Sequence, residues 1–233
     1  MGERPDITVV GAGIIGCAVA YELGRRGADV RVIDRRNVGC GATQASAGVL
    51  APFIEADHPG PLRALGVRSL ELYDEFVADV VADSGDDVPY ERSGTLEVAT
   101  DETALSRLER AQRGLALAGV DCRLLGRAEA REAEPHLGAP ALGALLVPSQ
   151  GFVGAVALTA ALCRAGIRHG VTFLTSRTAR RVSVGDGGIE IETTRGPVTS
   201  DAVVLAAGSW VGRVVVDGEA PLPIRPVRGQ LLR

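Results

Sequence analysis

The chain of 233 residues contains no lysine, so all 25 of its Lys and Arg positions are arginines. The absence of lysine excludes Schiff-base and lysine general-base chemistry. Aromatic residues make up only 3% of the chain and the formal net charge is -4, so the basic, aromatic-rich surface of a nucleic-acid-binding protein is not expected. No run approaches the roughly 18 consecutive apolar residues that cross a bilayer. We therefore expect neither a nucleic-acid partner nor a membrane span.

Cysteine is also scarce, and its four positions are scattered without a CxxC pair. This spacing suggests neither a metal site nor a redox dithiol. The segment of six residues that precedes the first apolar run is short and polar, and it does not resemble a signal peptide. We expect reduced thiols in a cytoplasmic protein that binds no metal. The cysteines are Cys17, Cys40, Cys122 and Cys163.

Residues 7–36 have the pattern of a strand, a glycine turn, a helix and a second strand that ends in an acid. Gly11, Gly13 and Gly16 have the GxGxxG spacing, which permits a tight turn, close approach of a pyrophosphate and close packing of the helix. Asp34 lies where an acid can accept hydrogen bonds from ribose hydroxyls. The pattern predicts a dinucleotide site. The expected elements are a strand at 7–10, a helix at 14–26 and a strand at 30–33.

The segment GCGATQASAGVLAP, residues 39–52, favours FAD over a nicotinamide cofactor. Its side chains are mostly small, which allows a ligand to lie close to the backbone. Thr43 and Ser46 can bond phosphate or ribityl oxygens, and a helix beginning near Thr43 would direct free amides at the second phosphate. A flexible glycine loop is the alternative. Arg35 and Arg36 also leave open a site for the 2′-phosphate of NADP.

Five segments resemble the FAD-dependent D-amino acid oxidase superfamily, and most closely its bacterial glycine oxidases of thiamine biosynthesis. They are VVGAGIIGCAVAYEL, VIDRR, GCGATQASAGVLAP, VVLAAGSW and PVRGQLL. The resemblance extends over the whole chain, with Asp34 where relatives commonly have Glu, and with no serine at Gln44 or Ala45. It implies an α/β fold: a Rossmann-like FAD-binding domain of the glutathione reductase type with a partial second α+β substrate domain.

The resemblance also implies which residues contact FAD. These are Gly11, Gly13, Ile15, Gly16, Asp34, Arg35, Thr43, Ala45, Ser46, Ala47, Gly48, Val49, Val182, Ala206, Ala207 and Gly208. The catalytic residues, including an arginine that grips the substrate carboxylate, are expected beyond Arg233. Trp210 is interpreted as a core residue without a catalytic role.

Periodicity predicts the remaining elements. Helices are expected at 62–81, 102–118, 127–134 and 155–168. Strands are expected as a pair within 90–100 and at 144–147, 171–175, 182–184, 189–193, 202–205 and 221–232. The expected domain segments are 1–86 and 148–216 for FAD binding, 87–147 for a partial substrate domain, and 217–233 for the start of a truncated substrate-domain strand.

The expected activity is the FAD-dependent oxidative deamination of glycine or small D-amino acids, with release of hydrogen peroxide, in thiamine biosynthesis. Expected partners are a small amino-acid substrate, dioxygen or another electron acceptor, and the missing C-terminal half or a second copy of the chain. The alternatives are a sarcosine oxidase, a D-amino acid dehydrogenase, an accessory FAD-binding subunit that is inactive alone, and an NAD-linked dehydrogenase.

Overall fold

The chain forms two compact units in a computed structural model that describes residues 5–55, 60–185 and 187–227. The first unit comprises Met1–Ala47, Val77–Pro89 and Gly154–Arg233, and the second comprises Gly48–Phe76 and Tyr90–Val153. Residues 48–76 therefore group with the second unit, whereas the sequence expectation assigned them to the first FAD segment. The expected domain boundaries themselves stay a prediction. Helix α3 (Pro61–Ser84) contributes to both units.

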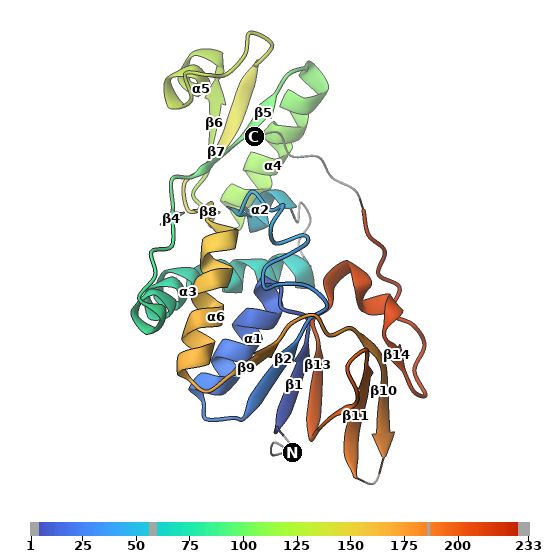
Figure 1. Ribbon diagram of the computed structural model, residues 1–233. Coiled ribbons are helices and arrows are strands. Elements are labelled where there is room, and N and C mark those ends of the chain that lie inside the picture. The colour runs from blue at the N-terminus through green and yellow to red at the C-terminus, as the bar shows by residue number, and fades with distance from the viewer. Residues whose placement is uncertain (1–4, 56–59, 186, 228–233) are drawn as a thin grey trace. The chain divides into compact units, whose positions relative to one another are not determined.

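A parallel sheet of four strands forms the centre of the first unit (Figure 1). The middle strand β1 pairs with β2 on one side and with β13 on the other. Thr8, Val9 and Val10 of β1 are buried, as expected for a parallel strand covered on both faces. The four strands confirm the sequence expectation closely. In spatial order they are β13 (Ala202–Leu205), β1 (Ile7–Val10), β2 (Val30–Ile33) and β9 (Thr172–Leu174).

Helices α1 (Ile14–Arg25) and α6 (Ala155–Arg168) pack along each other beside this sheet (Figure 1). Val10 and Ile33 of the sheet pack against Val182 and Ile191 of a second, largely antiparallel sheet. The first unit is thus built of helices, a parallel sheet and a second sheet. The strands expected at 182–184 and 189–193 lie in this second sheet and pair antiparallel. The second sheet contains β12 (Val198–Ser200), β11 (Gly188–Thr193), β10 (Ala179–Gly185) and β14 (Val215–Val216).

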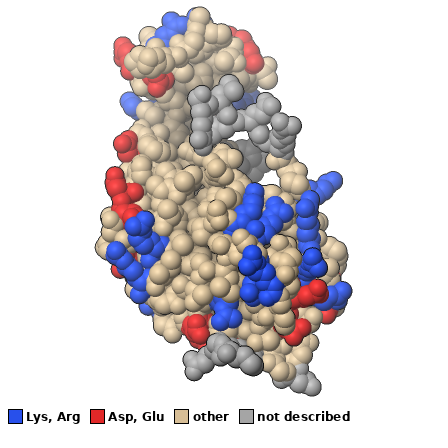
Figure 2. All heavy atoms as spheres, in the orientation of Figure 1, with Lys and Arg blue, Asp and Glu red and all other residues tan. Residues whose placement is uncertain are grey.

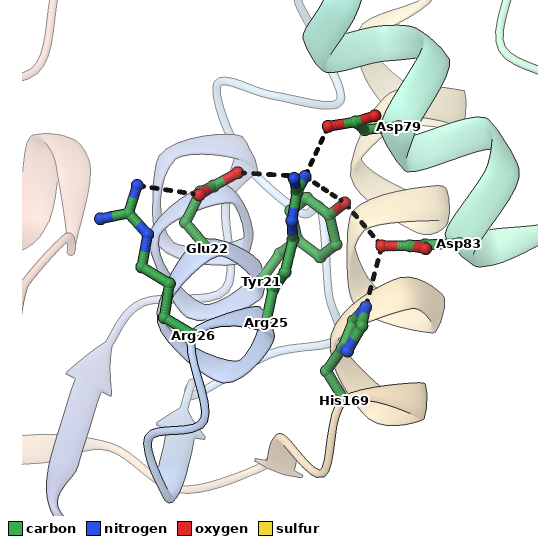
Figure 3. A network of polar contacts seen from close by, with 7 residues as sticks. All are labelled: Tyr21, Glu22, Arg25, Arg26, Asp79, Asp83 and His169. Atoms are coloured by element: carbon green, nitrogen blue, oxygen red, sulfur yellow. Dashed lines mark hydrogen bonds and ion pairs between the residues drawn. The ribbon is translucent and has the colours of Figure 1, made fainter.

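A polar network joins α1 to the last turns of α3 and α6 (Figure 3). The hydroxyl of Tyr21, on a fully buried ring, donates to Asp83 Oδ2 at 2.8 Å, and His169 Nε2 lies 2.8 Å from the same oxygen. Arg25 bonds Asp79 at 2.6 Å. The hydrogen bonds from His169 and then Tyr21 hold the pKa of Asp83 below its ordinary value. The network fixes three helix segments at the end of α1 away from the glycine turn.

The second unit contains two three-stranded antiparallel sheets and the helices around them. Asp101 caps α4 by accepting a hydrogen bond from the Ala104 amide at 2.8 Å, and Leu108 and Leu115 of α4 pack on Leu145. One sheet contains β3 (Val49–Leu50), β8 (Gly151–Val153) and β4 (Tyr90–Glu91), and the other contains β5 (Thr95–Ala99), β7 (Gly143–Val147) and β6 (Arg123–Gly126). The helices are α2 (Pro52–Glu55), α4 (Glu102–Leu117) and α5 (Arg127–Ala133), together with the part of α3 up to Phe76.

Two expected elements are wrong in the described structure. No helix begins near Thr43, because residues 38–45 form turns in which Gly39 and Gly41 have φ of 77° and 100°, and this left-handed backbone cannot lie in a right-handed helix. The strand expected at 221–232 is not formed over residues 221–227. Its last residues, 228–233, lie outside the described residues.

Candidate functional site

The glycine turn after β1 requires glycine at two of its three positions. Gly11 has φ of 117°, and a Cβ there would lie 2.3 Å from the backbone oxygen of Ala206. A Cβ on Gly16 would lie 1.8 Å from the backbone oxygen of Gly11. Side chains at these positions would push β1, β13 and α1 apart, so the small residues create a close junction at the carboxyl end of the sheet.

Thr43 is held against the N-terminus of α1. Its Oγ1 accepts a hydrogen bond from the Ile14 amide at 3.1 Å. A Cβ on Gly13 would approach the same oxygen to 3.3 Å. Among the described residues the amides of Ile15 and Gly16 have no hydrogen-bond acceptor, as expected for the first turn of a helix. These amides and the helix dipole can bind a phosphate.

Asp34 is fixed at the end of β2 by two backbone amides. Its Oδ2 accepts from the Ala12 amide at 2.8 Å, and its Oδ1 accepts from the Arg36 amide at 2.7 Å. Each carboxylate oxygen has a further lone pair, so the group can still accept a hydrogen bond from a ribose hydroxyl. The bond to Ala12 joins this acid directly to the glycine turn.

Trp210 lies beside the arginines that follow Asp34, and its interpretation as a core residue is wrong. The Cζ atoms of Arg35 and Arg36 lie 4.4 Å and 4.7 Å from the centroid of the indole. These distances are typical of cation–π contacts. The indole is half-buried and lines the cavity at the carboxyl end of the parallel sheet. Arginine atoms gather at this end of the first unit in Figure 2.

The cavity brings together half of the residues expected to contact the cofactor. Those that line it are Gly11, Gly13, Asp34, Arg35, Thr43, Ala206, Ala207 and Gly208. Residues that the sequence analysis did not assign also line it, namely Val10, Ile33, Arg36, Cys40, Ala42, Thr178, Ala179, Ser209, Trp210, Arg213 and Val214. Arg36 could have been found from its place beside Arg35. Trp210 ends the VVLAAGSW segment that carries the resemblance, which was a signal for it. Arg213 could not have been found, because the 3-10 helix Gly208–Arg213 that directs it has no clear sequence signal.

The other expected residues lie outside the lining. Ile15 follows the glycine turn with an exposed side chain, and Gly16 is enclosed by the turn itself. Ala45, Ser46 and Ala47 continue the loop from Thr43 and are exposed. Val182 is buried in the core with Val10 and Ile33, which do line the cavity. Gly48 and Val49 belong to the second unit, where a Cβ on Gly48 would lie 1.8 Å from the Val153 oxygen.

The buried thiol near the turn is not suited to nucleophilic chemistry. Cys17 Sγ lies 3.6 Å from the Ala12 backbone oxygen, to which it donates. Burial, with smaller contributions from Cys163 and Asp34, raises the pKa of the Cys17 thiol to about 12. A thiol with this pKa is almost entirely protonated near neutral pH, so Cys17 is a packing residue. All four cysteines are free thiols in the structure.

The cavity suits the adenosine diphosphate half of a dinucleotide. The glycine junction lets a ligand approach the backbone, the first turn of α1 offers free amides, and Asp34 offers a ribose acceptor. The Nε of Arg36 is buried and has no hydrogen-bond partner among the described residues, so it remains a donor for an anion. These features fit a strand–turn–helix dinucleotide site.

A family model described as FAD dependent oxidoreductase matches residues 6–233. The chain therefore belongs to the FAD dependent oxidoreductase family. This match confirms the expected FAD cofactor and the expected fold class, and it favours FAD over the NAD-linked alternative.

Within that family the chain is similar to proteins named glycine oxidase. It is 31% identical to the glycine oxidase of Geobacillus kaustophilus (strain HTA426) over 99% of this chain and 61% of the relative. It is also 31% identical to a bifunctional protein ThiO/ThiG of Nostoc sp. (strain PCC 7120 / SAG 25.82 / UTEX 2576), over 98% of this chain and 34% of the relative. The crystal structure of glycine oxidase from Geobacillus kaustophilus superposes with a TM-score of 0.88 at 30% identity, over 91% of this chain and 57% of that one. The chain thus spans about three fifths of the glycine oxidases it matches.

Proposed function

We propose that this chain is the FAD-binding part of an enzyme that oxidises the amine of glycine or another small amino acid. The observation that carries the proposal is the cavity at the carboxyl end of the parallel sheet, which combines a glycine turn, a free helix N-terminus and a ribose-accepting acid. The similarity to glycine oxidases over nearly the whole chain supports this substrate class.

The geometry supports a set of proposed cofactor contacts. The amides of Ile15 and Gly16 bind a phosphate, the Asp34 carboxylate accepts from the ribose, and Thr43 holds the loop against α1. Ala206 and Gly208 allow the cofactor to approach the end of β13. FAD, when bound, supplies the acceptor for the hydride taken from the carbon next to the amine. This chain's own residues bind and orient the cofactor.

The first test is the spectrum of the purified chain. We expect it to carry, or to take up, FAD and to show the paired absorbance bands of an oxidised flavin. Addition of FAD should also raise the melting temperature with increasing FAD concentration, because the cofactor binds the folded state. A colourless protein that does not take up added FAD would contradict the proposal.

The substrate is tested by peroxide release and flavin bleaching with glycine, sarcosine and D-alanine. Peroxide release with glycine or D-alanine supports the proposed oxidase, and preference for sarcosine selects the sarcosine oxidase alternative. Bleaching without peroxide indicates a dehydrogenase that uses another electron acceptor. A chain that binds FAD but oxidises none of the three amines supports the accessory-subunit alternative.

The finer expectations stay predictions. They are a role in thiamine biosynthesis, a cytoplasmic location, the use of dioxygen as acceptor, and assembly with a second copy or with a C-terminal half. Among the described residues, no helix has the length and apolar character required to span a membrane.

A further inference from the structure

Arg36 occupies a wall of the cofactor cavity that sequence reasoning did not assign to FAD. Its guanidinium lies 4.7 Å from the centroid of Trp210. A Cβ on Gly41 would lie 2.6 Å from Arg36 Nη2 and 3.2 Å from the indole. The absence of a side chain at Gly41 therefore leaves the space in which the guanidinium and the indole stack against the loop.

This loop is tied to the phosphate-binding turn on both sides of Gly41. The amide of Gly39 donates to the Ala12 oxygen at 2.8 Å, and Thr43 Oγ1 accepts from the Ile14 amide at 3.1 Å. The guanidinium of Arg36 thus lies beside a loop that is hydrogen-bonded at Gly39 to the glycine turn and at Thr43 to the first turn of α1. A diphosphate bound by the free amides of that turn would lie on this side of the cavity.

Among the described residues, no carboxylate forms an ion pair with the guanidinium of Arg36. Its Nε is buried without a hydrogen-bond partner among the described residues. Both oxygens of Asp34 bond backbone amides instead of the guanidinium. A second guanidinium, that of Arg35, lies 4.4 Å from the same indole centroid. Two like charges near one ring repel each other. A bound anion would offset this repulsion and would accept a hydrogen bond from the unsatisfied Nε of Arg36.

We propose that Arg36 is a further residue of the cofactor site, which binds the diphosphate of FAD and is positioned by stacking on Trp210. The inference rests on the FAD cofactor of the proposed function. Guanidinium groups bind phosphate oxygens through paired hydrogen bonds in a fixed geometry. The stack on Trp210 holds that geometry before the cofactor arrives, which lowers the entropy cost of binding.

The test measures binding, not turnover. Trp210 is the only tryptophan of the chain, so its fluorescence reports ligand binding at this cavity. We expect Arg36→Gln to lower the affinities for both FAD and ADP by roughly 10- to 100-fold, the range for a lost hydrogen bond to a charged group. The affinity for adenosine, which lacks the diphosphate, should be unchanged. The difference between wild type and Arg36→Gln should shrink at high salt because screening weakens the ion pair.

Matched variants separate a ligand role from a general charge effect. Arg113→Gln removes one positive charge from an exposed position on α4 of the second unit and should leave FAD affinity unchanged. Arg36→Lys should recover part of the lost affinity, since it restores the charge without the planar fork. For the indole, flavin fluorescence should show weaker FAD binding in Trp210→Leu and recovery in Trp210→Phe, because a phenyl ring preserves an aromatic face.

Three results would overturn the proposal. Equal ADP affinity in wild type and Arg36→Gln, or equal loss of ADP and adenosine binding, would show that Arg36 does not bind the diphosphate and would leave the proposed function intact. A wild-type chain that binds neither FAD nor ADP would overturn this inference and the proposed function together.

Discussion

Gly11 and Gly27 both have positive φ, but their surroundings differ. Gly11 has φ of 117°, with the Ala206 oxygen 2.3 Å from the position of a Cβ, whereas Gly27 has φ of 89° and open space around it. The left-handed backbone conformation alone therefore explains the glycine at position 27. At Gly11 the close approach of β13 adds a steric reason.

This difference predicts unequal effects of alanine at the two positions. Gly27→Ala should lower the free energy of unfolding by about 1 to 2 kcal/mol, the cost of a left-handed alanine. Gly11→Ala should cost more, by a further ~1 to 3 kcal/mol of overpacking, and should also weaken FAD binding. Urea unfolding and flavin titration measure the two effects. Equal destabilisation by the two variants would contradict the role assigned to the Gly11–Ala206 contact.

At the scale of elements, strand β1 carries an unusual polar side chain. Thr8 is fully buried, and its hydroxyl has no hydrogen-bond partner among the described residues. Thr159 of α6 is also buried, yet its hydroxyl donates to the Ala155 oxygen at 2.6 Å. The two threonines thus have the same side chain and similar burial but different hydrogen bonding.

We expect Thr8→Val to raise the free energy of unfolding by about 1 kcal/mol, because a methyl group replaces an unsatisfied hydroxyl. The matched change Thr159→Val removes a satisfied hydroxyl and should give no comparable gain. Chemical denaturation of the two variants and the wild type measures the difference. Destabilisation by Thr8→Val would mean that its hydroxyl has a partner in solution.

The length of an element decided how well the sequence predicted it. Helix α6 (Ala155–Arg168) was predicted to the residue, and α3 and α4 to within a few residues, because several turns repeat the apolar spacing. Strands β3 and β8 are two and three residues long. Such strands are too short to show alternation, and they form because Val49 and Phe152 pair across the sheet.

For the molecule as a whole, acid stability depends on carboxylates in both units. Asp83 of the first unit is held below its ordinary pKa of 3.8 by hydrogen bonds from His169 and then Tyr21. Asp74 of the second unit is held below the same value by Arg92 and then Tyr90. A lowered native pKa means that the unfolded state binds protons more readily, so the stabilisation is present above about pH 4 and is lost as the pH falls through the native pKa.

We therefore expect the free energy of unfolding to fall as the pH is lowered below about 4. Asp83→Asn and Asp74→Asn should each flatten part of this decline, since an amide has no proton to gain. Asp121→Asn serves as a control, because Asp121 is exposed and forms no ion pair among the described residues. Urea unfolding from pH 6 to pH 2.5 measures the profiles. An unchanged slope in both Asp83→Asn and Asp74→Asn would contradict the assignment.

The sequence by itself determined the dinucleotide turn, most helices, the central strands and the class of cofactor. These are local properties, because glycine spacing, apolar periodicity and the acid after β2 lie within a few tens of residues of one another. The tertiary structure decided the conformation of residues 38–45. These residues form turns instead of starting a helix, and the Thr43 hydroxyl accepts a hydrogen bond from the first turn of α1.

Only the tertiary structure also placed Arg36 against Trp210, two residues separated by 173 intervening positions in the sequence. No local pattern predicts such a pair. It forms because β13 lies beside β1 and the 3-10 helix that follows β13 directs the indole toward the end of β2. Contacts between segments distant in the chain depend on how the sheet is ordered, and this order is set by packing of the whole unit.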